Sequence, residues 1–211
     1  ILQQGTNKAD IGRLYQWMTL LMGMKPYHHE YKIMGLAPYA TEIEVQKSLK
    51  IFENIFFVDP KDTLIKYKHK PTDLYFHFKS SLEGHRFDGI AGALQRTLEI
   101  LLVEWFDLLS QRYKKNTICY GGGVAMNVKA NGVVLTDSKI KDLFVPLSPS
   151  DESNAIGAAY YSLEKDLVVA EENPNEKLLA LPNAYLGKNI ENVDIKNALI
   201  KYKINNQDFT I

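Results

Sequence analysis

Apolar residues recur at helical spacing along three long segments of the chain. In residues 10–24 they return every three or four positions, which predicts an amphipathic helix. Residues 41–56 predict a second helix, because Thr41 and Glu44 have the spacing of a capping box. The longest pattern, residues 88–113, carries a wide apolar stripe and predicts a helix that crosses the domain.

Shorter patterns predict strands and loops between and after these helices. Residues 63–67 and 74–78 alternate polar with β-branched or aromatic side chains, which predicts a pair of strands. Residues 26–39 are rich in Gly, Pro and His around a small apolar cluster, so we expect a partly buried loop. Residues 168–182 are acidic and polar and predict a linker, and residues 183–211 contain one short helix candidate.

The order strand, turn, helix occurs twice in the second half of the chain. The apolar runs 117–120 and 142–146 predict buried strands, and each precedes a turn and a helical pattern, residues 124–135 and 154–165. Two such units in succession are typical of an α/β domain in which helices pack on a layered sheet. We therefore predict the α/β class.

Composition and charge narrow the function classes. The 211 residues are 45% hydrophobic and 24% charged, as in a soluble globular protein. Lys plus Arg (25) balances Asp plus Glu (25), which argues against a nucleic-acid partner. No apolar run approaches the roughly 20 residues that span a bilayer, so no membrane partner is expected.

The single cysteine, Cys119, excludes an internal disulfide and suits a reducing compartment, so we expect a cytoplasmic location. The chain also begins without methionine. We expect it to be a piece of a longer polypeptide, with N- and C-terminal parts missing.

The triple glycine at residues 121–123 is the most informative stretch. Glycines after a strand let the backbone approach a ligand closely, and the following helix directs free N–H groups at it, which together form a phosphate cradle. Asn127, one helical turn beyond, is placed to hydrogen-bond a ribose or phosphate. The alternative is a tight turn that binds nothing, and spacing alone leaves both interpretations open.

Two charged residues have the same double interpretation. Asp151 opens a helix, so it is either an N-cap or a carboxylate that faces a metal or phosphate. Lys32 either neutralises a phosphate or is a solvated lysine that pairs with Glu30. His28 and His29 are adjacent and make a poor bidentate metal site.

Three stretches taken together resemble one family, the carbamoyltransferases typified by the nodulation and antibiotic O-carbamoyltransferases. They are residues 31–39 (YKIMGLAPY), 121–132 (GGGVAMNVKANG) and 144–159 (FVPLSPSDESNAIGAA). Residues 12–15 (GRLY) and 88–95 (DGIAGALQ) are similar to weaker helix motifs of the family. The resemblance covers roughly residues 10–165.

The resemblance implies a fold and a domain division. The family's N-terminal domain shares the ribonuclease H-like architecture of actin, Hsp70-type proteins and sugar kinases. Residues 1–170 would be the second half of that nucleotide-binding domain. Residues 171–211 would be a linker and the start of the C-terminal domain, which Tyr185-Leu186-Gly187 would open.

The resemblance also implies an activity. Such enzymes take carbamoyl phosphate and ATP, form a carbamoyl-adenylate and pass the carbamoyl group to a hydroxyl of a sugar-like acceptor. On the matching positions, the nucleotide would be held by Gly121, Gly122, Gly123 and Asn127, with Glu30 and Lys32 beside it. Asp151 would supply one ligand to a divalent metal, iron or another.

Departures from the family pattern leave alternatives. The family's spaced pair of metal-binding histidines has no match before Tyr31, so the metal site is incomplete and the chain alone is predicted to be inactive. One alternative is the related enzyme type that makes threonylcarbamoyladenosine in tRNA. Another is a non-catalytic, nucleotide-binding scaffold domain.

Overall fold

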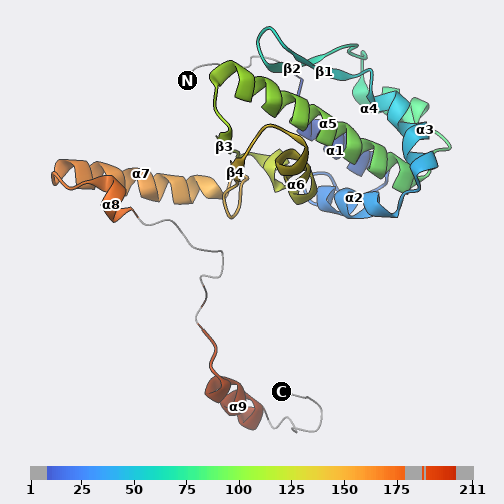
Figure 1. The fold of residues 1–211 in the computed structure, drawn as a ribbon. Helices are drawn as coiled ribbons and strands as arrows, with labels where there is room; N and C mark the ends of the chain where they lie inside the picture. Colours follow the sequence, from blue (N-terminus) through green and yellow to red (C-terminus); the bar gives the residue numbers. More distant parts are fainter. Residues whose placement is uncertain (1–8, 179–186, 188, 203–211) are drawn as a thin grey trace. The chain divides into compact units, whose positions relative to one another are not determined.

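The long helix α5 (Phe87–Tyr113) is the element on which the first part of the chain is assembled (Figure 1). The computed structural model describes residues 9–178, 187 and 189–202 of the chain. It divides into a first unit, Ile1–Tyr161, and a second, Ser162–Ile211, which we describe separately. Within the first unit, α5 contacts helices and strands from both sides of it in the sequence. The architecture is mixed α/β, which confirms the predicted class.

The first unit begins with helices and a hairpin. In chain order its elements up to α5 are α1 (Gly12–Leu21), α2 (Glu30–Leu36), the 3₁₀ turn η1 (Ala37–Tyr39), α3 (Glu42–Phe52), β1 (Phe56–Asp59), β2 (Leu64–Tyr67) and α4 (Leu74–Ser81). The strands β1 and β2 pair antiparallel, with Phe56 opposite Tyr67 and Asp59 opposite Leu64. Figure 1 shows this hairpin lying along α5.

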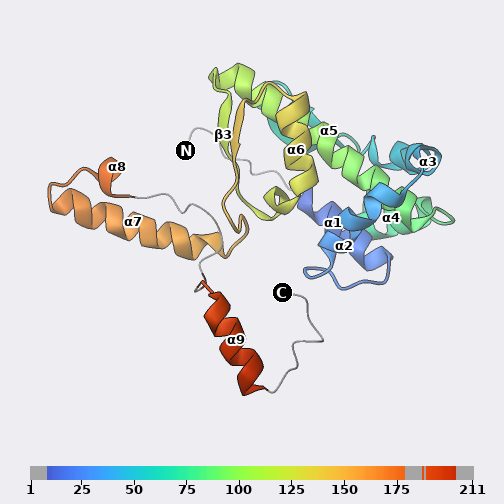
Figure 2. The same ribbon diagram turned by 60° about the horizontal axis from the view of Figure 1, so that its bottom comes forward.

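After α5 the chain forms a parallel strand pair. The elements are β3 (Thr117–Cys119), the 3₁₀ turn η2 (Gly123–Met126), α6 (Val128–Asp137), β4 (Asp142–Phe144) and α7 (Ser153–Val169). Thr117 pairs with Asp142 and Cys119 with Phe144. Figure 2 shows the two strands beside each other, with α6 next to them.

The core of the first unit is apolar and closely packed around α5. Its fully buried large side chains include Phe52 of α3, Phe78 of α4 and Phe106 of α5. The rings of Phe52 and Phe78 stack with centroids 5.1 Å apart. The predicted amphipathic helices are confirmed, because their stripes supply this core.

Two glycines of the 88–95 motif let other elements approach α5 closely. A Cβ built on Gly92 would lie 2.6 Å from Cγ2 of Val45 in α3 and 3.1 Å from Cβ of Ala40. A Cβ on Gly89 would lie 2.9 Å from the carbonyl oxygen of Glu44. The motif therefore has a packing role, because it seats α3 and the end of the 31–39 stretch against α5.

Two of the predicted elements in the first half of the chain are wrong in type. Residues 74–78 form the start of α4 rather than a strand, because the Asp73 carboxylate accepts a hydrogen bond from the Phe76 N–H (3.0 Å) and caps a helix. Phe76 and Phe78 consequently do not share a face: Phe78 is fully buried and Phe76 is 65% exposed. The true partner of β2 is β1.

Residues 30–36 form helix α2, where we expected a loop, because Ile33 is fully buried on one face of the helix. Pro38 follows in η1, at a position where its missing N–H costs little. The predicted helix 41–56 ends at Phe52, and residues 56–59 form β1, in which Phe56 and Val58 alternate into the core.

The second unit, as far as the structure describes it, is helical. It contains the continuation of α7, then α8 (Pro174–Lys177) within the segment predicted as a linker, and α9 (Asn192–Lys201). The short helix predicted near the end of the chain is confirmed as α9. Tyr185 and Leu186 lie outside the described residues. Among the described helices, none combines the length and the hydropathy needed to cross a membrane.

His85 gives the first unit a predictable pH dependence. Its Nδ1 lies 2.9 Å from Oγ of the fully buried Ser48, and burial, with a further contribution from Lys47, holds the pKa of His85 below its ordinary value of 6.5. Below pH 6.5 the unfolded chain therefore binds a proton that the folded chain resists, so stability falls as the pH falls. We expect urea denaturation at pH 7.5 and 5.5 to show a smaller loss of stability in His85→Gln than in the wild type. An equal loss would contradict this assignment.

Candidate functional site

The parallel strands bring two turns to the same edge. The Tyr120 N–H donates to the Phe144 carbonyl (2.8 Å), and the Gly122 N–H donates to the Pro149 carbonyl (2.6 Å). The triple-glycine turn and the Ser148–Ser153 turn therefore lie together at the carboxyl ends of β3 and β4.

The triple-glycine turn has a backbone shape that requires glycine. Gly122 has φ +102°, a region that residues with a Cβ rarely adopt, and open space surrounds the Cβ position of Gly123. A 3₁₀ turn, η2, follows where the sequence predicted the start of a helix, and α6 begins only at Val128. Helix α6 begins later than predicted because Asn127 has non-helical backbone angles and its side chain caps the helix by accepting from the Ala130 N–H.

A cavity of about 450 Å³ opens beside this turn. Its walls come from α1, from α2 and the segment that leads into it, from η2 and, through Leu98, from α5. The lining residues that carry polar groups or belong to the glycine turn include Asp10, Tyr15, His28, Glu30, Gly123 and Asn127. Three of the predicted nucleotide-binding residues, Glu30, Gly123 and Asn127, are thus brought to one cavity from segments far apart in sequence.

The remaining predicted residues lie elsewhere. Gly121 and Gly122 continue the turn toward Pro149 and are outside the cavity lining. Lys32 is exposed, with its Nζ 5.9 Å from the ring centroid of Tyr31, and it too is outside the lining.

Glu30, which does line the cavity, accepts a hydrogen bond from the Tyr27 N–H (2.6 Å). This bond holds the backbone at Tyr27, where φ is +66°.

Asn127 belongs to a buried hydrogen-bond network. Its Nδ2 donates to the Tyr15 hydroxyl (3.1 Å) and to Oε1 of Gln95 (2.8 Å). Its Oδ1 accepts from Nε2 of Gln95 (3.1 Å) and from the Ala130 N–H (2.9 Å). The Tyr15 hydroxyl donates to Oε1 of Gln95 (2.6 Å), and burial raises the pKa of Tyr15 far above its ordinary value, so the phenol stays protonated.

Sequence reasoning missed Tyr15 and Gln95 as parts of the site. Tyr15 fits the apolar stripe of the first predicted helix, and Gln95 is the last residue of the 88–95 motif, so neither local pattern marks a site residue. The available signal was Gln95 itself, because a polar residue within the apolar stripe of a core helix must find a partner or incur a desolvation cost. Gln95 is 1% exposed, and Asn127 is that partner.

Asp151 is exposed and lies in the turn after β4. Among the described residues, the Asp151 carboxylate accepts no hydrogen bond, so the structure gives no support to the N-cap interpretation. Within the same part of the chain, no three His, Cys, Asp or Glu side chains are grouped so that they could hold a metal ion. The described residues alone therefore do not fit a complete metal site, which needs several protein ligands.

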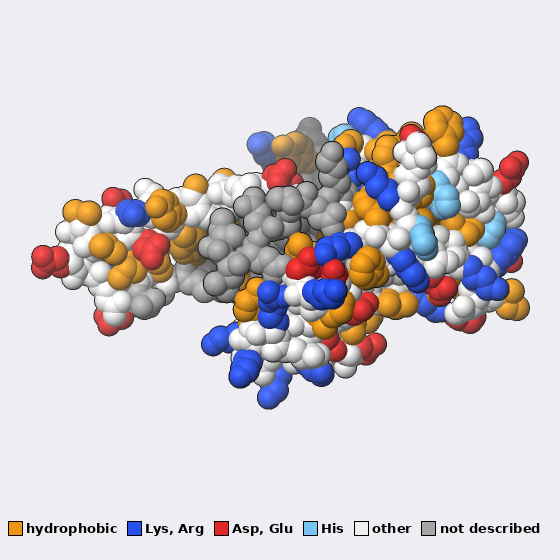
Figure 3. All heavy atoms as spheres, turned by 90° about the horizontal axis from the view of Figure 1, so that it is seen from above, with side chains coloured by type: hydrophobic (Ala, Val, Ile, Leu, Met, Phe, Trp, Pro, Cys, Tyr) orange, Lys and Arg blue, Asp and Glu red, His pale blue; other side chains and the backbone are white. Residues whose placement is uncertain are grey.

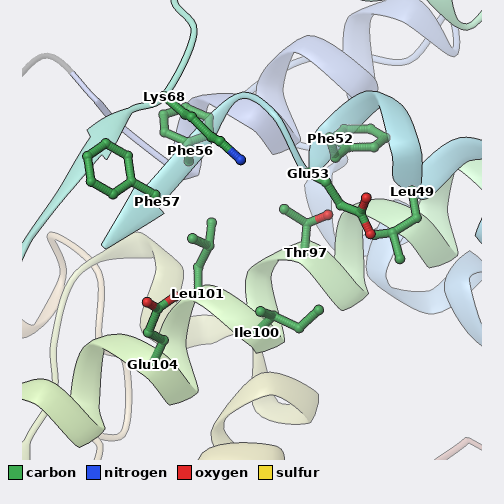
Figure 4. A pocket seen from close by; sticks show the side chains of 10 residues that line it. All are labelled: Leu49, Phe52, Glu53, Phe56, Phe57, Lys68, Thr97, Ile100, Leu101 and Glu104. Carbon is green, nitrogen blue, oxygen red and sulfur yellow. The ribbon is translucent and has the colours of Figure 1, made fainter. Parts of the chain in front are cut away.

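A second cavity, of about 570 Å³, is lined by residues of α5, of the end of α3 and of the β1–β2 hairpin region (Figure 4). Figure 4 shows hairpin side chains facing α5 across it, and its lining is mainly apolar, from Phe52, Phe56, Phe57, Ile100 and Leu101, with Lys68, Glu53 and Glu104 at its edges. Burial raises the pKa of Glu104. None of the residues predicted for the site lies in this cavity.

The surface in Figure 3 shows charges of both signs. On the face drawn there, several Lys and Arg side chains (blue) gather along the lower edge at the centre, and elsewhere Asp and Glu side chains (red) lie among blue ones. Beside the glycine turn, the charged groups of the cavity lining are Asp10 and Glu30, and the lining also includes His28.

Comparison with known proteins decides the family. Residues 6–160 match the family described as Carbamoyltransferase N-terminus, which is most of the chain and nearly all of the first unit. The chain belongs to the carbamoyltransferase family. The glycine turn, the 450 Å³ cavity and the buried network all lie within the matched residues.

Relatives of this carbamoyltransferase chain are longer. An uncharacterized protein of Methanocaldococcus jannaschii, MJ1051, is 32% identical over 97% of the chain and 39% of its own length. The uncharacterized protein sll1178 of Synechocystis is 27% identical, over 90% of the chain and 33% of its own length. The nodulation protein NolO of Bradyrhizobium diazoefficiens is 26% identical, over 77% of the chain and 29% of its own length. The chain thus spans between about three and four tenths of these relatives.

Proposed function

We propose that this chain supplies part of the nucleotide site of an O-carbamoyltransferase. The complete enzyme would use ATP and carbamoyl phosphate to form a carbamoyl-adenylate, and would transfer the carbamoyl group to a hydroxyl of a sugar-like acceptor. The observation that carries the proposal is the convergence of Glu30, Gly123 and Asn127 on one 450 Å³ cavity within a chain of the carbamoyltransferase family. The finer fold assignment, half of a ribonuclease H-like domain, and a cytoplasmic location are part of the same proposal.

The chemistry explains what the cavity would have to do. Joining two anionic phosphate compounds requires charge neutralisation and orientation, and it does not require a nucleophilic side chain. The glycine turn offers close backbone approach, and Lys32 would have to move toward the cavity in order to neutralise a phosphate. Asp10 and Glu30 are acidic, so a phosphate bound there would need a counter-cation.

Asp151 is proposed as one ligand of a divalent metal, iron or another, with the other ligands supplied from outside the described residues. Because the chain covers a minor share of its relatives, residues from the rest of the polypeptide would also complete the carbamoyl-transfer site. For that reason we do not expect this chain by itself to transfer a carbamoyl group.

The proposal is tested by titration calorimetry of ATP into the 211-residue chain, with and without Mg²⁺. We expect saturable binding that Asn127→Ala weakens by roughly tenfold, because the substitution removes the hydrogen bonds that hold the turn. Asn192→Ala, at an exposed position of α9, is the control and should bind as the wild type does. Undetectable ATP binding by the wild type would contradict the proposal for this chain.

A further inference from the structure

Two groups at the ends of the network, the Ala130 N–H and the Glu99 carboxylate, fix which way the side-chain amides of Asn127 and Gln95 point. The Ala130 N–H can only donate, so the atom of Asn127 that faces it is the oxygen. A carboxylate can only accept, so the atom of Gln95 that faces Oε1 of Glu99 (2.8 Å) is the nitrogen. The two amides then pair reciprocally, and the Tyr15 hydroxyl accepts from one and donates to the other.

This arrangement leaves Asn127 fully occupied. An Asn side chain has two N–H groups and two acceptor positions, and all four are used by Tyr15, Gln95 and Ala130. A ligand could bond to this side chain only by displacing a partner that is itself buried, which is costly. Direct contact from Asn127 to a nucleotide therefore conflicts with the geometry.

We propose that Asn127, Gln95 and Tyr15 are positioning residues, which fix the triple-glycine turn against α1 and α5 so that its backbone can receive a phosphate. The inference rests on the proposed function. Asn127 is the residue through which the other two act, because it ends η2, which begins at Gly123 of the turn, and caps the following helix α6. The network thus links the 12–15, 88–95 and 121–132 motifs, each through one side chain.

Gln95 allows a positioning role of the network to be distinguished from direct contact with the ligand. It is 1% exposed and does not line the 450 Å³ cavity, whereas Tyr15 and Asn127 do. Any effect of Gln95 on ligand affinity must therefore pass through the residues it holds. Gln95→Met keeps a similar length and volume and removes the hydrogen bonds to Asn127, Tyr15 and Glu99.

The test compares ATP and adenosine affinities of the wild-type chain, Gln95→Met and Phe78→Leu by calorimetry at 15 °C, with each melting temperature recorded. Phe78→Leu destabilises the same unit in α4, outside the cavity lining. We expect Gln95→Met to weaken ATP binding roughly fivefold or more and to change adenosine affinity much less, because the phosphates are the groups that the turn would hold. Phe78→Leu should leave both affinities unchanged.

The possible outcomes distinguish a failure of the positioning role from a failure of the proposed function. If the wild type binds ATP and Gln95→Met binds it equally well while Asn127→Ala does not, Asn127 contacts the ligand directly and the inference is wrong. If Phe78→Leu weakens ATP binding as much as Gln95→Met, the effect is loss of stability and the positioning role is again wrong. If the wild type binds no ATP, the proposed function fails, and this inference fails with it. Should Gln95→Met not fold, Gln95→Leu repeats the test, because it removes the same hydrogen bonds at the same position outside the cavity lining.

Discussion

Phe106→Ala is expected to destabilise the first unit by about 3–5 kcal/mol, the usual cost of deleting a large aromatic side chain from a core. Phe106 is 1% exposed in α5. Its ring stacks on Trp105 with centroids 5.2 Å apart and meets the edge of Tyr120 at 5.1 Å. Tyr120 directly precedes Gly121, so the cavity left by the substitution would lie where α5 supports the strand that carries the glycine turn.

The measurement is urea denaturation followed by tryptophan fluorescence. The chain's two tryptophans, Trp17 and Trp105, both belong to the first unit, so the signal reports on that unit. Ile100→Ala on the same helix is the control. Because Ile100 is 52% exposed, we expect it to cost less than about 1 kcal/mol. Similar losses for the two variants would mean that α5 does not form the core of this unit.

The sequence predicted those elements whose local pattern agrees with their tertiary contacts. The stripes of α1, α3 and α5 are wide enough to specify both a helix and its buried face. In these helices the period of the pattern and the environment in the fold select the same structure. The strands β3 and β4 were predicted from two short apolar runs, each followed by a turn and a helix. Their expected burial is wrong, because both end residues of each strand are exposed and only the central one is half-buried.

The errors arose where a short segment fits two periods. In residues 74–78, Leu74, Phe76 and Phe78 alternate as in a strand, but the cap at Asp73 and burial of Phe78 against Phe52 select a helix. In residues 30–36 the glycine and the nearby proline indicated a loop, and burial of Ile33 outweighed them. Tertiary contacts decide such segments, and a single sequence does not display them.

The candidate site was predictable in its backbone and not in its side chains. The three glycines predict a turn with a positive φ angle, and Gly122 has a φ of +102°. The partners of Asn127 could not be predicted, because Tyr15 is 112 positions away and Gln95 is 32 positions away. The sequence placed Asn127 near a ligand, and the structure shows that its side chain is bonded within the protein.

Gly92→Ala is expected to destabilise the first unit by about 1–3 kcal/mol, although alanine is the better helix former. The new Cβ would lie 2.6 Å from Cγ2 of Val45, a buried, β-branched side chain with little rotamer freedom, and 3.1 Å from Cβ of Ala40, which can move only with its backbone. Relief would therefore require α3 to shift away from α5. That shift would also disturb the 31–39 motif, which ends beside Ala40.

Gly132→Ala is the matched control, because Gly132 lies in the middle of α6 and nothing is within 4 Å of its Cβ position. Both substitutions gain the same helix propensity, about 1 kcal/mol, so the difference between them isolates the packing cost. Urea denaturation should show Gly132→Ala slightly more stable than the wild type and Gly92→Ala clearly less stable. If both variants gain stability, α3 and α5 do not approach each other closely at Gly92, and the packing role assigned to the 88–95 motif is wrong.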